Sequence, residues 1–135
     1  MARIVIVEDD ALVAKYLKYV LEQDGRDDVV VTESGDEVLA FARDPITVAL
    51  VVDVSLRNTQ LGGRYVDGLE LSRAVKADPG ASHVAIIIAT AYTMAGDRER
   101  FLRESGANAF IRKPITDSRE VLSLIAEFVG RREDS

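Results

Sequence analysis

Five residues in this chain have side chains that could act together on a phosphoryl group. Glu8 and Asp9 follow one apolar segment, Asp53 ends another, Thr90 ends a third, and Lys113 follows a fourth. An aspartate carboxylate can attack phosphorus and form an aspartyl phosphate. A lysine ammonium would neutralise charge on the transferring group, and a threonine hydroxyl can hydrogen-bond a phosphoryl oxygen. These residue types favour phosphoryl transfer to Asp53, provided that the fold brings them together.

A divalent cation would make such a cluster of carboxylates tolerable. Glu8, Asp9 and Asp53 would repel one another if they met without one. Mg²⁺ suits hard oxygen ligands and commonly takes one or two carboxylates with phosphate oxygens and water, so we expect Mg²⁺ as the cofactor. The simpler alternatives are that Glu8 and Asp9 cap a helix, that Asp53 begins a turn and that Lys113 is a solvated charge.

A sheet of parallel strands would carry these residues to a common edge. β-Branched apolar runs alternate with helical apolar periods five times along the chain. Strands are predicted at residues 4–7, 29–32, 48–53, 84–89 and 107–111, and helices at 11–24, 34–44, 67–77, 92–105 and 117–130. The predicted fold class is therefore α/β, a doubly wound five-stranded parallel sheet with five helices on its two faces.

The predicted helices and loops differ in how well they should be anchored. The fourth helix, from Tyr92 to Ser105, has few apolar positions among many charges, so we expect it to be mobile. Residues 55–65 have no sustained period, and Gly62-Gly63 indicates a flexible turn in a long loop. The first helix repeats apolar pairs four residues apart, which predicts one buried stripe of Leu12, Val13, Tyr16, Leu17, Val20 and Leu21.

Composition limits the class of protein and its partners. The chain has 135 residues, of which 47% are apolar and 30% charged, with a net charge of -6 and no cysteine. This balance is typical of one globular domain, which we place at residues 1–130, followed by a charged tail at 131–135. The acidic charge argues against direct binding to nucleic acid or membrane, and we find no signal peptide or membrane span. We expect a cytoplasmic protein with protein partners.

Taken in chain order, these residues resemble those of the receiver domains of two-component response regulators. The resemblance covers nearly the whole chain and implies a flavodoxin-like sheet with strand order 2-1-3-4-5. Its motifs are Glu8-Asp9 after the first strand, Asp53 closing the third, Asp67-Gly68 opening the third helix, Thr90-Ala91 closing the fourth strand, and Lys113-Pro114, usually a cis peptide bond, after the fifth.

The resemblance implies a phosphoacceptor role for Asp53. The donor would be a phosphohistidine on a sensor histidine kinase or a histidine phosphotransfer protein. Glu8 and Asp9 would hold Mg²⁺ together with Asp53 and the backbone carbonyl of Ser55, and Lys113 would bind the phosphate.

The resemblance also implies residues that switch and tune the domain. Thr90 matches the switch hydroxyl, and Phe110 matches an aromatic that swings inward on activation, although plain core packing would also explain an aromatic there. Ser55 and Tyr92 match positions that influence water access to the phosphoryl group. We expect the Tyr92 ring to slow hydrolysis.

One segment departs from the family's pattern. The family usually has a proline four residues after the acceptor aspartate, where this chain has Arg57, and Asp67-Gly68 comes about seven residues late. We expect residues 57–65 to form an extra rim over the phosphorylation face that affects partner choice or water access.

The expected function is that of a single-domain response regulator without an output domain, a phosphoacceptor switch rather than an enzyme. It would signal through protein binding at the face of the fourth helix, fifth strand and fifth helix, which could also form a homodimer. An Asp-nucleophile phosphohydrolase is disfavoured because Ser55 stands where such enzymes carry a second acid. A flavin or nucleotide binder is disfavoured by the acidic loop after the first strand. A phosphorylation-independent interaction module is disfavoured because all the reactive positions are filled.

Overall fold

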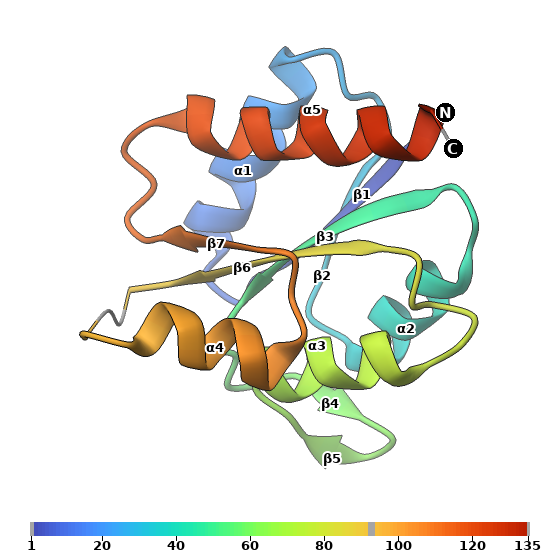
Figure 1. The fold of residues 1–135 in the computed structure, drawn as a ribbon, viewed down its shortest axis with the longest axis vertical. Coiled ribbons are helices and arrows are strands. Elements are labelled where there is room, and N and C mark those ends of the chain that lie inside the picture. Colours follow the sequence, from blue (N-terminus) through green and yellow to red (C-terminus); the bar gives the residue numbers. More distant parts are fainter. Residues whose placement is uncertain (1, 92–93, 135) are drawn as a thin grey trace.

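Five parallel strands form the central sheet of the computed structural model, which describes residues 2–91 and 94–134. Their order is β2-β1-β3-β6-β7, and each neighbouring pair is parallel. The strands of this sheet are β1 (Arg3–Val7), β2 (Val29–Thr32), β3 (Thr47–Asp53), β6 (Ala85–Thr90) and β7 (Ala109–Arg112). Counted within this sheet, the order confirms the prediction 2-1-3-4-5 (Figure 1).

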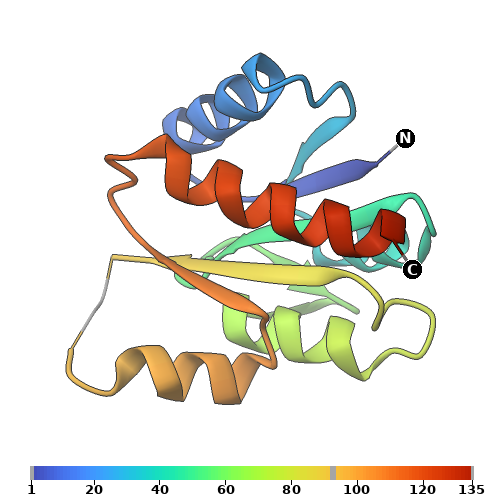
Figure 2. The ribbon, with the colours of Figure 1, turned by 45° about the horizontal axis from the view of Figure 1, so that its top comes forward.

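The helices cover the sheet on both faces. The two that pack on one face are α1 (Ala11–Gln23) and α5 (Ser118–Asp134), and those on the other are α2 (Gly35–Arg43), α3 (Gly68–Ala77) and α4 (Asp97–Ser105). Figures 1 and 2 show the sheet between these two layers. The doubly wound α/β fold class is therefore confirmed. Within the described residues, no helix has the length and apolar character needed to cross a membrane.

Strand β3 lies at the centre of the core. All seven of its residues are buried, as a continuous apolar run predicts for a strand covered on both faces. Leu50 and Val52 pack with the layer of α2, α3 and α4, whereas Val51 packs with the layer of α1 and α5. The strand ends at Asp53, so this carboxylate lies at the carboxyl edge of the sheet.

The prediction of one buried stripe on α1 is wrong in part. Leu17 and Leu21 are buried as expected, together with Ala14. Leu12 and Tyr16, however, are 80% and 41% exposed. The apolar residues extend around more of the helix than the sheet and α5 cover, so part of the apolar surface of α1 faces solvent.

The long loop after β3 contains a hairpin that the sequence pattern did not predict. Its strands β4 (Gln60–Leu61) and β5 (Arg64–Tyr65) pair antiparallel and are joined by Gly62 and Gly63. Both glycines have positive φ, 60° and 80°, a conformation that favours glycine in two-residue hairpin turns. Strands of two residues are too short to show an alternating pattern, so only the turn was visible in the sequence.

The structure differs from the prediction at two helix boundaries. Helix α4 begins at Asp97 rather than near residue 92, because Gly96 adopts a left-handed conformation that ends the preceding segment. Tyr92 lies outside the described residues. The backbone of α5 continues to Asp134, so most of the segment expected to be a charged tail is helical.

Candidate functional site

The carboxyl edge of the sheet brings together the predicted site residues. In the parallel registers, Val7 pairs with Val52 and Asp53 pairs with Ala89, so the residues that follow β1, β3 and β6 emerge side by side. A cavity of about 440 Å³ opens there. It is lined by Glu8, Asp9, Asp10, Asp53, Ser55, Arg57, Ala91 and Lys113.

Three carboxylates form a cluster at this cavity. One carboxylate oxygen from each of Glu8, Asp9 and Asp53 lies within 4.8 Å of the others. Lys113 Nζ is 2.6 Å from Glu8 Oε1 and 3.4 Å from Asp53 Oδ1. Glu8 and Asp53 are buried, 4% and 5% exposed, whereas Asp9 is half-buried. The three carboxylates outnumber the single ammonium group and offer hard oxygen ligands, so the site fits Mg²⁺.

Burial and neighbouring charges shift the pKa values of Glu8 and Lys113. Burial and a hydrogen bond to Asp53 raise the pKa of Glu8 from 4.5 to about 7, and the opposing effect of Lys113 does not cancel this. For Lys113, burial acts to lower the pKa, but the hydrogen bond to Glu8 and the charges of Asp53 and Glu8 outweigh it and raise the pKa. Lys113 therefore stays a cation at neutral pH and can attract the charge of a phosphoryl group.

The backbone around Asp53 is held by the start of α3. The Ser55 backbone N–H donates to Asp53 Oδ1 at 3.1 Å. Asp67 caps α3 in a capping box with Glu70, and the Gly68 N–H donates to the Val54 carbonyl at 3.0 Å. A Cβ atom on Gly68 would lie 2.0 Å from the Asp53 carbonyl oxygen, so only glycine fits there. This close approach explains the Asp-Gly pair at the beginning of α3.

The predicted switch residues lie on the two strands beyond Asp53. Thr90, at the end of β6, is fully buried, and its carbonyl accepts the Lys113 backbone N–H at 2.9 Å. Phe110 on β7 is half-buried and stacks on Phe101 of α4, with ring centroids 6.4 Å apart. The peptide bond between Lys113 and Pro114 is cis, as predicted.

The loop after β1 makes two further contacts beside the acidic cluster. Asp10 is the N-cap of α1, where its side chain accepts the N–H groups of Leu12 and Val13. The Arg57 backbone N–H donates to Asp9 Oδ2 at 3.1 Å. Aspartate is a common N-cap residue, which accounts for the first contact. The second involves only the backbone of residue 57, so no side-chain type signals it.

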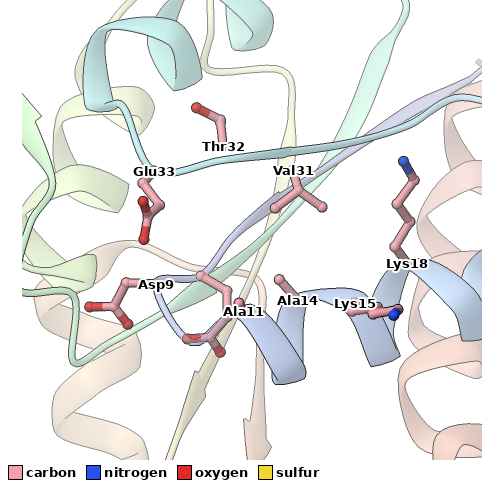
Figure 3. Close-up of a pocket in the computed structure, with 9 residues that line it drawn as sticks. Asp9, Ala11, Ala14, Lys15, Lys18, Val31, Thr32 and Glu33 are labelled. Atoms are coloured by element: carbon pink, nitrogen blue, oxygen red, sulfur yellow. The ribbon is translucent and has the colours of Figure 1, made fainter.

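A second cavity adjoins the acidic cluster between α1 and the edge strand β2 (Figure 3). It has a volume of about 490 Å³, and Glu8 and Asp9 line both cavities. Lys15 and Lys18 lie on its α1 side, and Val31 lies on β2. The acidic cluster is therefore accessible along α1 as well as from the strand ends.

Comparison with known proteins identifies the family. The family model for the response regulator receiver domain matches residues 4–126. The chain therefore belongs to the response regulator receiver domains of two-component signalling.

Relatives and solved structures agree with this assignment. The polar-differentiation response regulator DivK of Brucella ovis is 33% identical over 127 residues, which cover 94% of this chain and 95% of that protein. A CheY-like receiver domain protein from Methanospirillum hungatei has a TM-score of 0.75 at 28% identity, with 99% and 98% of the two chains covered.

A second similar structure contains a metal ion. It is the receiver domain of the sensor histidine kinase PA1611 from Pseudomonas aeruginosa, with magnesium coordinated in its active-site cleft. It has a TM-score of 0.77 at 25% identity, and 96% of this chain and 98% of that one are covered.

Proposed function

We propose that this protein is a response regulator that accepts a phosphoryl group on Asp53 from a sensor histidine kinase or a phosphotransfer protein. It would work in the cytoplasm, as a switch with no turnover beyond its own phosphorylation and dephosphorylation. The observation that carries the proposal is the convergence of Asp53, two further carboxylates and the Lys113 ammonium in one cavity.

The chemistry is a displacement at phosphorus. A carboxylate oxygen of Asp53 attacks the phosphoryl group, the new O–P bond forms, and the P–N bond to the donor histidine breaks with its electron pair returning to the imidazole. Glu8, Asp9 and the Ser55 backbone carbonyl would hold Mg²⁺ with Asp53, and the ion would supply positive charge to the phosphoryl oxygens. Lys113, 3.4 Å from Asp53 Oδ1, supplies a second positive charge.

The signal leaves the site through Thr90 and Phe110. The phosphoryl group gives the Thr90 hydroxyl a new charged hydrogen-bond acceptor, which favours a position of Thr90 closer to Asp53. Phe110 stacks on Phe101 of α4, so a shift of Phe110 changes how α4 packs on the sheet. The face of α4, β7 and α5 then binds its target, either another protein or a second copy of this chain.

An apolar surface beside the site supports a protein as the phosphoryl donor. A cavity of about 570 Å³ adjoins the phosphorylation cavity, since Asp10, Ala91 and Lys113 line both. Its apolar lining includes Leu12 and Ile115. A donor protein that covers this surface would bring its phosphohistidine close to Asp53.

The test of the proposal is titration with Mg²⁺ and beryllofluoride, a mimic of the phosphoryl group, followed by NMR. Mg²⁺ alone should shift the signals of the acidic cluster, and beryllofluoride added in its presence should cause further saturable shifts at Asp53, Thr90 and Lys113. The Asp53→Asn variant should show no further shift with beryllofluoride. A wild-type protein whose NMR signals do not shift with either component would contradict the proposal. A variant that shows the same shifts as the wild type would contradict it too.

A further inference from the structure

We propose that the backbone amide of Arg57 is a positioning group for the metal ligand Asp9, and that the β4–β5 hairpin holds this amide in place. The inference rests on the proposed function of the site. Its central observation is the hydrogen bond from the Arg57 N–H to Asp9 Oδ2, 3.1 Å long, which joins residues 48 positions apart in the chain.

The hydrogen bond fixes one oxygen of a carboxylate that has two. Asp9 is less buried than Glu8 and Asp53, and none of the salt bridges among the described residues includes it. With Oδ2 bound to the amide, the Asp9 side chain is restrained and its other oxygen remains available to a cation. Hydrogen bonds of this kind to ligating carboxylates orient the ligand, and their loss typically weakens metal binding by about 10-fold to 100-fold.

Buried residues on both sides of Arg57 hold its amide in this position. Leu56 is 6% exposed and Thr59 is fully buried, although the Arg57 side chain between them is exposed. The Val66 N–H donates to the Thr59 carbonyl at 3.0 Å, which closes the loop at the base of the hairpin. The backbone of residue 57 is thus fixed while its side chain is free to vary.

The hairpin in turn packs against the start of α2. The Gly62 N–H donates to Asp36 Oδ1 at 3.0 Å, and Leu61 packs on the core. A Cβ atom on Gly35 would lie 2.5 Å from the Gln60 carbonyl oxygen, so the hairpin approaches α2 as closely as glycine allows. Figure 1 shows β4 and β5 beside α2 and α3 rather than across the strand ends. Arg57 lines the acidic cavity, so the predicted rim is present at this one residue. The rest of the inserted segment packs against α2 and connects it to the metal ligand.

Two substitutions at one position isolate the amide. Arg57→Pro and Arg57→Ala both remove the guanidinium, but only proline also removes the N–H. The measurement is the dissociation constant for Mg²⁺ alone, from NMR titration of each folded variant. We expect binding by Arg57→Pro to be about tenfold weaker than by Arg57→Ala. Equal dissociation constants in the two variants would overturn the role of the amide.

Hydrogen exchange of the wild-type protein tests the hydrogen bond of the Arg57 amide without a substitution. The Arg57 amide should exchange more slowly than the exposed amides of the hairpin turn, and this measurement decides the matter if Arg57→Pro does not fold. Exchange at the rate of a free amide would overturn the inference. If the wild type does not bind Mg²⁺ at all, the proposed function fails as well. If the wild type binds Mg²⁺ and the two variants bind it equally well, only the role of the Arg57 amide fails.

The contribution of the hairpin is tested at α2. Gly35→Ala should displace Gln60 and weaken Mg²⁺ binding several-fold, although residue 35 lies outside the acidic cavity. The matched control is Gly130→Ala, where an added Cβ meets open space within α5. Equal Mg²⁺ affinities in these two variants would overturn the part played by the hairpin.

Discussion

Helices α3 and α4 pack against each other on the same face of the sheet but are anchored very differently. α3 has a capping box at Asp67 and buries residues along most of its length. α4 has Gly96 as its N-cap residue, which makes no side-chain capping hydrogen bond, and the helix buries only Phe101 and Ser105. Helix stability comes mostly from packing and capping, so α3 is held firmly and α4 weakly.

Under the proposed function, this difference indicates which part of the domain would move on phosphorylation of Asp53. The start of α3 is fixed to Asp53, because Gly68 lies so close to the backbone of that residue that a Cβ atom would not fit. α4 is connected to the site through Phe101 and Phe110, two rings that can shift relative to each other. A weakly held element beside a firmly held one is what a switch requires, since segments of low local stability are the ones that rearrange.

The largest expected difference comes from the same substitution made in both helices. Leu71 of α3 is fully buried, so Leu71→Ala should lower the free energy of unfolding by about 3 kcal/mol. Leu102 of α4 is only half-buried, and Leu102→Ala should cost about 1 kcal/mol. Urea denaturation of the two variants measures both values, and equal losses would contradict the comparison.

The pH dependence of stability tests the acidic cluster next to the fixed start of α3. In the metal-free protein the pKa of Glu8 is raised from 4.5 to about 7, so between these values the folded state holds more protons than the unfolded chain. The free energy of unfolding should therefore fall as the pH rises from 5 to 7, by on the order of 2 kcal/mol.

Glu8→Gln provides the control for this pH effect. The variant should show a flatter dependence in urea denaturation over the same range. The carboxyls of Asp78, Asp97 and Asp117 have pKa values that neighbouring groups lower, so they titrate below this window. An unchanged slope in the variant would show that another group is responsible.

Hydrogen exchange should separate the two helices directly. Amides in the middle of α4 should exchange about tenfold faster than those in the middle of α3, corresponding to about 1.4 kcal/mol in local opening free energy. Native-state exchange followed by NMR gives both sets of rates. If α3 opens as readily as α4, the assignment of α4 as the mobile element is wrong.

The smallest effect concerns the cap of α3. Asp67→Ala removes a side chain that accepts the Glu70 N–H at 2.8 Å and should cost about 1 kcal/mol. Asp27→Ala is the matched control, because Asp27 is exposed and lies outside the helices. Thermal unfolding should show a clearly larger loss for Asp67→Ala, and equal losses would remove capping as a reason for the firm anchoring of α3.

The sequence predicted the sheet and the acidic cluster because both depend on strong local patterns. Long β-branched runs end in chemistry-bearing residues, and the parallel topology alone brings Glu8, Asp53 and Lys113 to one edge. The exposed side of α1 was not predicted, because periodicity gives the spacing of apolar residues but not how far neighbouring elements cover them.

The contacts of the loop after β3 could not be predicted for a different reason. The strands β4 and β5 are two residues long, so they carry no periodic signal. The hydrogen bond from Arg57 to Asp9 uses a backbone N–H that every residue except proline possesses. Only the folded arrangement shows that the amide reaches the carboxylate.

Phosphorylation of the protein by a small acyl phosphate is the decisive test of Asp53 as the phosphoryl acceptor. The protein is incubated with the donor and Mg²⁺, and the modified residue is located by peptide mass spectrometry, with Asp53→Asn treated in parallel. We expect one phosphoryl group, on Asp53, that depends on Mg²⁺ and is absent from the variant. A wild-type protein that stays unmodified, or a variant that is labelled to the same extent, would contradict this role of Asp53.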